Sequence, residues 1–177
     1  MSLNNCEELF IEFQQGKLDA LDSIYLAYKN PLYCFIYRYT NNEQLSIDIV
    51  QDTFEKLHKK KHQYNPEKGS FKTYLFQIAY NTMITKINRQ NRLKALLPFL
   101  AQPISQPISS EEKLTVRAAL QALPENLRAV VILMYYHDLT QKDIAEVLNI
   151  PLGTVKSRLS RALKRLKEDL EVKDDEK

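Results

Sequence analysis

The 177-residue sequence has only three glycines, only two cysteines and no long run of apolar residues. Few glycines, together with apolar residues at helical spacing, are typical of helices rather than strands. We therefore predict an all-α fold. The two thiols, Cys6 and Cys34, form no Cys-x-x-Cys pair and have no histidine at ligand spacing. Neither a disulfide framework nor a structural zinc site is predicted.

No segment reaches the roughly 18 uninterrupted apolar residues of a membrane helix, and MSLNNCEELF lacks the basic start and apolar run of a signal peptide. We expect a cytoplasmic protein without membrane insertion.

The three histidines, His58, His62 and His137, have no Ser, Asp or Cys partner at motif spacing. His58 and His62 could share a helix face, but histidines in a lysine run are more often surface residues than metal ligands. No catalytic site, metal or cofactor is predicted.

The formal net charge is only +3, but the charges are segregated. Cations gather at positions 56–61, 89–94 and 156–167, whereas acidic residues gather at 48–55 and 171–176. Separate patches of opposite sign imply partners of both signs.

Residues 139–170, LTQKDIAEVLNIPLGTVKSRLSRALKRLKEDL, predict two helices joined by a tight turn. Thr140 is placed to cap the first helix, and Pro151-Leu152-Gly153 marks the break before the second. The small Ala145 on the apolar face of the first helix lets the second pack closely. Because the turn is too short for parallel packing, the helices must cross steeply. The stretch is predicted to be a helix-turn-helix.

At about 100° per residue, the second of these helices has an apolar stripe and an opposite polar face. The stripe consists of Val155, Leu159, Ala162, Leu163, Leu166 and Leu170. Short hydroxyls lie at the centre of the polar face, and long cations flank them: Lys156, Ser157, Arg158, Ser160, Arg161 and Lys164. No acidic residue occurs between Gly153 and Lys167. Such a face suits a DNA major groove; the alternative is an ordinary helix with a solvated basic face.

The upstream half predicts a series of amphipathic helices. The first covers residues 6–16, and a second begins at Asp19 or Asp22 and ends at Lys29. Pro31 is expected to open a third, because proline suits the first turn of a helix. Its inner face would be Leu32, Phe35, Ile36 and Tyr39.

From Glu43, a further helix is predicted with an apolar face and an acidic outer surface. The apolar positions are Ile47, Val50, Phe54 and Leu57, and the outer surface carries Asp48, Gln51, Asp52 and Glu55. An acidic helix face is usually just solvated, so by itself it says little about function.

The segment KKKHQYNPEKGSFKTYL predicts a basic loop, because Asn65-Pro66 and Lys68-Gly69-Ser70 are breakers in close succession. Three aromatic residues lie in this segment: Tyr64, Phe71 and Tyr74. Aromatic rings in a basic loop suit unstacked bases; the alternative, which we favour for Tyr74, is that they fill the local core. The helix after the loop has a cationic outer face that suits a nucleic-acid backbone: Asn81, Lys86, Arg89 and Arg92.

Residues 95–113, ALLPFLAQPISQPISSEEK, contain three prolines and a repeated QPIS, and are predicted to be a linker. We expect two small helical domains, with separate cores, on this flexible linker. The boundaries are 1–94 for the upstream domain, 114–171 for the helix-turn-helix domain and 172–177 for an acidic tail.

The run LQALPENLRAVVILMYYHDLTQKDIAEVLNIPLGTVKSRLSRALKRL resembles region 4 of the extracytoplasmic-function sigma factors, small two-domain members of the sigma-70 family. Residues 45–92, especially IVQDTFEKL, YNPEKGSFKTYLFQIAYNT and NRQNR, resemble their region 2. The chain departs from the usual family pattern at Ile47, Tyr74, Thr85 and Asn88, which marks a divergent subgroup.

The resemblance implies a transcription initiation factor that binds the clamp and flap of core RNA polymerase and promoter DNA. The clamp would be bound by Asp48, Gln51, Asp52 and Glu55. The minus 35 element would be read by Thr154, Lys156, Ser157, Arg158, Ser160, Arg161 and Arg165. The minus 10 element would be bound by Tyr64, Asn65, Lys68, Ser70, Phe71, Asn81, Lys86, Arg89 and Arg92. Family members usually have an anti-sigma factor, and the apolar part of the linker offers a place for one to bind.

The alternative is a helix-turn-helix regulator with an N-terminal helical effector or dimerisation domain. Such a regulator would bind DNA by itself as a two-fold dimer. A sigma factor would be monomeric when free and would bind DNA weakly until polymerase holds both domains. The promoter sequence and the inducing signal do not follow from the residues, because DNA shape also contributes to recognition.

Overall fold

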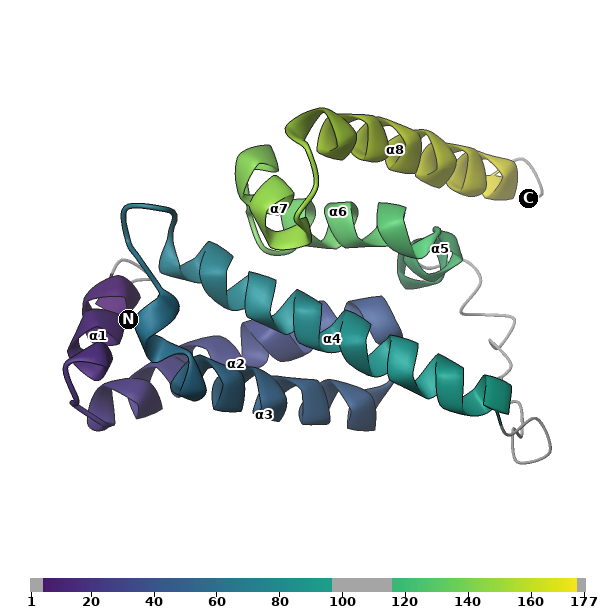
Figure 1. Ribbon diagram of the computed structural model, residues 1–177. Helices are drawn as coiled ribbons and strands as arrows, with labels where there is room; N and C mark the ends of the chain where they lie inside the picture. The colour runs from purple at the N-terminus through teal and green to yellow at the C-terminus, as the bar shows by residue number, and fades with distance from the viewer. Residues whose placement is uncertain (1–4, 97–115, 175–177) are drawn as a thin grey trace.

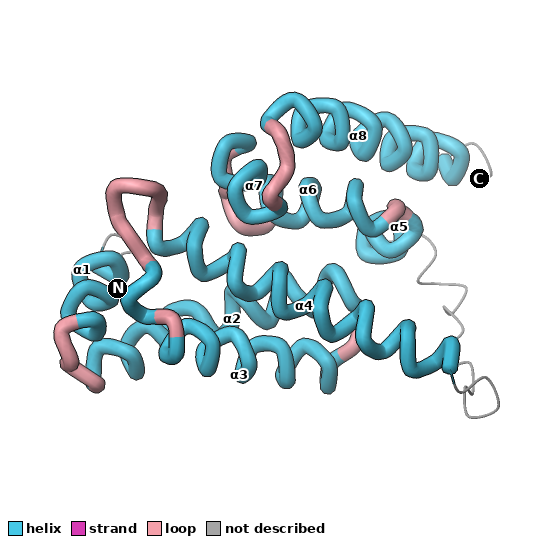
Figure 2. The backbone as a smooth tube through the Cα atoms, in the orientation of Figure 1, coloured by secondary structure: helices cyan, strands magenta, loops and turns pink. Residues whose placement is uncertain are grey.

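A computed structural model describes residues 5–96 and 116–174 of the chain, and the regular elements in these two ranges are all helices (Figure 1, Figure 2). The predicted all-α class is confirmed. In chain order the elements are α1 (Asn5–Gln14), α2 (Asp19–Thr40), α3 (Glu43–Lys59), the 3₁₀-helix η1 (Lys61–Gln63), α4 (Phe71–Leu96), α5 (Val116–Ala122), α6 (Glu125–Tyr135), α7 (Gln141–Leu148) and α8 (Leu152–Asp174).

Helices α1 to α4 form the upstream module, in which α3 packs against both α2 and α4, and α1 packs on α2 (Figure 1). Asn41 ends α2 in the left-handed conformation with φ 52°, and the Asn42 side chain accepts a hydrogen bond from the Leu45 amide to cap α3. Two consecutive asparagines therefore reverse the chain between two long helices. The rings of Phe10, Phe13 and Phe35 are fully buried in the resulting core.

Helix α2 continues through Pro31, so the predicted break between Lys29 and Pro31 is wrong. A proline inside a helix removes one backbone hydrogen bond and costs about 3 kcal/mol. Here a single apolar stripe runs the whole length of α2, from Ala20 and Ile24 to Tyr39, and is buried throughout. Burying that stripe on one side of the bundle outweighs the cost of the proline.

Two large apolar side chains in this module lie on the surface, and for one of them, Ile47, the helical spacing predicted core. Ile47 is 46% exposed, and its expected place is taken by Ile49, which is fully buried with Val50 and Leu57. Tyr25 is 42% exposed, although its ring still packs edge-on against Phe54. The inner face of α3 is thus rotated from the predicted one, and Ile47 lies beside the acidic residues instead.

Helices α5 to α8 form the downstream module. Pro124 separates α5 from α6, and α8 packs against α5, α6 and α7. On α8, Val155, Leu159 and Ala162 are buried as expected, but Leu163 is 44% exposed. Helix α8 ends at Asp174, so the predicted acidic tail begins inside the helix.

The two modules are docked against each other, and their buried side chains form one continuous core rather than the two separate cores that we expected. Helix α7 lies along α4, and α5 and α6 contact α2 (Figure 2). The predicted linker, apart from Ala95 and Leu96 at the end of α4, falls outside the described residues. Within the described ranges, no helix is long and apolar enough to cross a membrane.

His137, between α6 and α7, lies in the interface between the modules. Its ring contacts the rings of Phe35 and Phe76, with centroids 5.8 and 4.9 Å away, and its Nε2 atom is buried without a hydrogen-bond partner. Burial, and then the nearby cations of Arg38 and Lys72, lower the pKa of His137 to about 4, while Asp138 partly opposes them. The ring is therefore neutral at pH 7.

We predict that this histidine makes the fold sensitive to mild acid. An unfolded histidine takes up its proton near pH 6.5, but folded His137 does so only near pH 4. The free energy of unfolding therefore has its full value above pH 6.5 and decreases as the pH falls from 6.5 to 4. At pH 5 the loss is about 2 kcal/mol. His137→Phe keeps the ring contacts and removes the titrating group. Urea unfolding at pH 7 and pH 5 should show a smaller loss of unfolding free energy for His137→Phe than for the wild type. An equal loss in both proteins would contradict the prediction.

Candidate nucleic-acid and polymerase interfaces

The helix-turn-helix is held together by local hydrogen bonds, among them the cap at Thr140 that the sequence predicted. Thr140 and Asp143 form a reciprocal capping box at the start of α7, and Asn149 ends α7 in the left-handed conformation with φ 51°. The Ile150 amide then donates to the Ala145 carbonyl, 3.0 Å away. Helix α7 is thus capped at both of its ends, and α8 starts directly after Pro151. The short turn between them sets the angle between α7 and α8.

The polar face of α8 is largely open to solvent, and α8 lies on the side of the downstream module away from α3 (Figure 1). Thr154 and Arg158 are half-buried, and the other residues predicted to read the minus 35 element are exposed: Lys156, Ser157, Ser160, Arg161 and Arg165. The Arg161 Nε atom donates to the Ser157 carbonyl, 3.2 Å away. This bond holds the start of the side chain along the helix. The exposed cations of this face can therefore reach an anionic groove.

We predict that Arg161 reads bases and Arg158 contacts phosphate. Arg161→Ala should weaken promoter binding by about 1 to 3 kcal/mol and relax the preference at one minus 35 position. Arg158→Ala should weaken binding to all sequences alike and make its salt dependence shallower. Competition binding with single-base variants of one promoter measures both effects. Uniform weakening by Arg161→Ala would place that side chain on phosphate instead.

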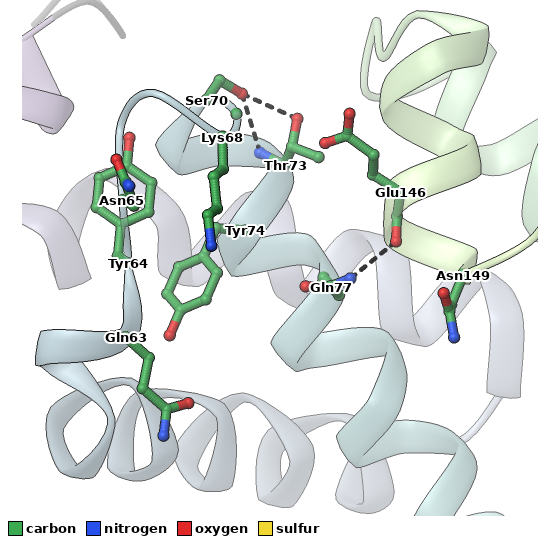
Figure 3. A pocket seen from close by; sticks show the side chains of 11 residues that line it. Gln63, Tyr64, Asn65, Lys68, Ser70, Thr73, Tyr74, Gln77, Glu146 and Asn149 are labelled. Atoms are coloured by element: carbon green, nitrogen blue, oxygen red, sulfur yellow. Dashed lines mark hydrogen bonds between the residues drawn. The ribbon is translucent and has the colours of Figure 1, made fainter.

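The loop between η1 and α4 borders a pocket of about 410 Å³ (Figure 3). Lys68 and Ser70 in its lining are exposed, Asn65 and Tyr74 are half-buried, and the Tyr74 hydroxyl donates to the Lys60 carbonyl. Its lining also includes Gln63, Tyr64, Gly69, Thr73, Gln77, Glu146 and Asn149. The pocket thus combines a lysine, amides, hydroxyls and an accessible aromatic ring.

Tyr64 and Phe71 are core residues in this structure, contrary to the expectation that both rings are free for bases. Tyr64 is 6% and Phe71 is 1% exposed, and the Phe71 ring stacks on Phe10 with centroids 4.6 Å apart. Glu7 on α1 accepts hydrogen bonds from the Phe71 amide and the Tyr64 hydroxyl. Burial, and then Glu7, raise the pKa of Tyr64 to about 12. Tyr74 is the ring that the structure leaves partly accessible in this pocket.

The outer face of α4 carries the remaining residues predicted to bind the minus 10 element. Asn81, Arg89 and Arg92 are exposed, but Lys86 forms an ion pair with Asp52, with Nζ and Oδ2 2.9 Å apart. A second pocket of about 220 Å³ adjoins Asn81 and brings in residues that the sequence reasoning missed: Lys56, Lys60 and Gln63. The lysine run at positions 59–61 was the signal for them.

The acidic face, defined as Asp48, Gln51, Asp52 and Glu55, lies on α3, on the side of the upstream module away from the helix-turn-helix (Figure 1). Gln51 and Glu55 are exposed, and Asp48 and Asp52 are half-buried. Its carboxylates contact surface side chains: Gln44 donates to Asp48, Lys59 pairs with Glu55, and Lys86 of α4 pairs with Asp52. Exposed ion pairs of this kind contribute little to stability, so the carboxylates can exchange partners at low cost.

Comparison with known proteins decides the family. The model of sigma-70 region 2 matches residues 24–93, and that of sigma-70 region 4 matches residues 113–166. The ECF RNA polymerase sigma factor SigM of Bacillus subtilis is 30% identical over 155 residues, which cover 83% of this chain and 93% of the relative. The chain belongs to the extracytoplasmic-function sigma factors. It is an alternative sigma factor of the sigma-70 family, which directs transcription initiation.

Other relatives and solved structures agree with this family. The sigma factor SigW of B. subtilis is 27% identical and covers 90% of this chain and 93% of its own length. The sigma factor RpoE, solved with the anti-sigma factor NepR from Bartonella quintana, superposes with a TM-score of 0.71 at 24% identity, covering 85% of this chain and 96% of that one. CnrH, solved with the cytosolic domain of CnrY, has a TM-score of 0.70 at 22% identity, and the match covers 93% of this chain and 96% of that one. The two solved structures show the fold of this sigma factor.

Proposed function

We propose that this sigma factor binds core RNA polymerase with the acidic face on the clamp and the downstream module on the flap. The observation that carries the proposal is that α3 and α8 present an acidic face and a cationic face to solvent on different sides of the molecule (Figure 1). One face suits a basic protein surface and the other suits DNA. The protein acts in the cytoplasm, where polymerase and DNA are.

In this proposal α8 reads the minus 35 element, and the loop pocket with the outer face of α4 binds the melted minus 10 element. Stacking of an unpaired base on an accessible ring offsets part of the cost of unstacking it from the duplex. Tyr74 takes this role in place of Tyr64 and Phe71, which lie in the core. The protein has no enzymatic role here, since polymerase performs the chemistry. An anti-sigma factor is the remaining partner, as for the relative RpoE.

In vitro transcription tests the proposal. Core polymerase is incubated with fragments of the source genome, with and without this protein, and the transcripts are mapped. Transcripts that start at a shared sequence motif only when the protein is present support it. A regulator of the alternative class would change transcription only in the presence of another sigma factor.

A further inference from the structure

Helix α1 lies beside the minus 10 loop, defined as residues 64–70, which leads from η1 into α4 (Figure 1). Three side chains at helical spacing form the face of α1 that meets this loop: Glu7, Phe10 and Gln14. The pocket beside the loop is lined, among the described residues, by the loop itself and by parts of η1, α4 and α7. Helix α1 therefore supports the loop without lining the pocket.

Glu7 holds both ends of the loop through one carboxylate oxygen. Its Oε1 atom accepts a hydrogen bond from the Phe71 amide, 2.9 Å away, and another from the Tyr64 hydroxyl, 3.3 Å away. Phe71 is the first residue of α4, so its amide has no partner within the helix, and a carboxylate suits the positive end of the helix dipole. A single side chain of α1 thus joins the two ends of the loop.

Gln14 holds the start of the loop from the other end of α1. Its Nε2 atom donates to the carbonyls of Lys61 and Tyr64, 2.6 and 3.2 Å away. Between Glu7 and Gln14, the Phe10 ring stacks on Phe71 and lies edge-on to Tyr64, with the second pair of centroids 5.5 Å apart. Polar contacts at both ends of α1 and an aromatic contact in its middle therefore fix the course of the loop.

The anchored residues adjoin those that are proposed to meet DNA. The Tyr64 ring contacts the ring of Tyr74, the accessible aromatic residue of the pocket, with centroids 5.3 Å apart. Asn65 directly follows Tyr64, and Ser70 directly precedes Phe71. A shift of either anchored residue would therefore displace the groups that line the pocket. Groups that are fixed before binding lose less conformational entropy when the ligand arrives.

From these contacts we propose that Glu7 and Gln14 are positioning residues for base selection in the minus 10 element. They set the shape of the loop, and the loop side chains then select among unpaired bases; neither anchor contacts DNA. The inference rests on the proposed role of this loop in DNA binding. Loss of either anchor lowers the affinity for unpaired DNA and the discrimination between bases, while the acidic face and α8 keep their own partners.

The test uses substitutions that separate the hydrogen bonds from the size of the side chains. Glu7→Ala removes the acceptor, whereas Glu7→Gln keeps an oxygen acceptor at the same place. Gln14→Glu keeps the size of the side chain but replaces the donor with a carboxylate, which repels the two carbonyls. Glu8→Ala and Gln15→Glu are matched controls, because both residues are exposed and directly follow the anchors in the chain.

Each variant is assembled with core polymerase on a promoter recovered by the transcription assay, with a mismatched bubble over the minus 10 element. Competition with single-base variants of the bubble measures base discrimination as a ratio of two affinities. A partly unfolded sample lowers both affinities alike, so a merely structural role would leave this ratio unchanged. Thermal unfolding of the free protein is followed in parallel. Lys68→Ala is included because Lys68 is exposed in the pocket and is proposed to contact DNA directly.

We expect Glu7→Ala and Gln14→Glu to bind the preferred bubble about tenfold more weakly, and to bind the single-base variants nearly as well as the preferred one. Glu7→Gln and the two controls should stay within about threefold of the wild type. Wild-type discrimination by Glu7→Ala and Gln14→Glu, or a loss in Glu7→Gln as large as in Glu7→Ala, would overturn the proposal. Lys68→Ala keeps the two levels apart. If it weakens bubble binding while the anchor variants do not, only the positioning role fails; if it has no effect either, the proposed DNA-binding role of the loop fails too.

Discussion

Asp52→Arg is expected to reduce co-purification with core RNA polymerase by about a hundredfold, because it reverses a charge in the middle of the acidic face. Asp52 is half-buried and pairs with Lys86. The substitution removes an acceptor from the face that is proposed to meet a basic polymerase surface, and adds a repelling cation. The helical circular dichroism should not change, since a partly exposed ion pair contributes at most about 1 kcal/mol.

Glu12→Arg is the matched control for this experiment. Glu12 on α1 is also a partly exposed carboxylate, and it pairs with Lys17 at 3.0 Å, much as Asp52 pairs with Lys86 at 2.9 Å. It lies outside the acidic face, so its reversal should leave polymerase binding intact. Equal binding by wild type and Asp52→Arg would show that the acidic face is only a solvated surface.

The parts of the fold that the sequence predicted are those set by neighbours along the chain. The cap at Thr140 and the turn at Pro151 depend on backbone groups within a few residues. Helical spacing also placed Val155 and Leu159 of α8 in the core. Local hydrogen bonds and periodicity carry enough information for these features.

The errors arose where a distant segment decides the environment of a side chain. Tyr64 and Phe71 became core residues because Phe10 and Glu7, more than fifty positions away, cover them. A basic loop with aromatic residues has the same sequence signature whether its rings are buried or free. Pro31 has the local preference of a helix start, but the buried apolar stripe continues on both sides of it and keeps α2 one helix.

Docking of the modules could not be predicted for the same reason. The Thr73–Asp143 hydrogen bond joins residues 70 positions apart, on opposite sides of the linker. Asp143 also completes the capping box of α7, so its presence was already explained locally. Periodicity shows that a helix has an apolar face, but it does not show which helix that face contacts.

The second large effect expected is that this sigma factor recognises promoters only together with polymerase. Binding of one linked module raises the effective affinity of the other for DNA only if both DNA sites lie within reach at the same time. In the free protein the modules are docked, and the minus 10 bases are stacked inside duplex DNA. Core polymerase would hold the modules at promoter spacing, and its contacts would share the cost of melting. We therefore expect weak, nonspecific binding to duplex promoter by the protein alone.

Footprinting on one promoter recovered by the transcription assay tests this account most directly. The promoter is probed with the protein alone, core polymerase alone and both together, and permanganate then reports unpaired thymines. Protection and reactive thymines should appear only in the combined sample. A sharp, two-fold symmetric footprint from the protein alone, unaffected by polymerase, would contradict the account and assign the upstream module to dimerisation.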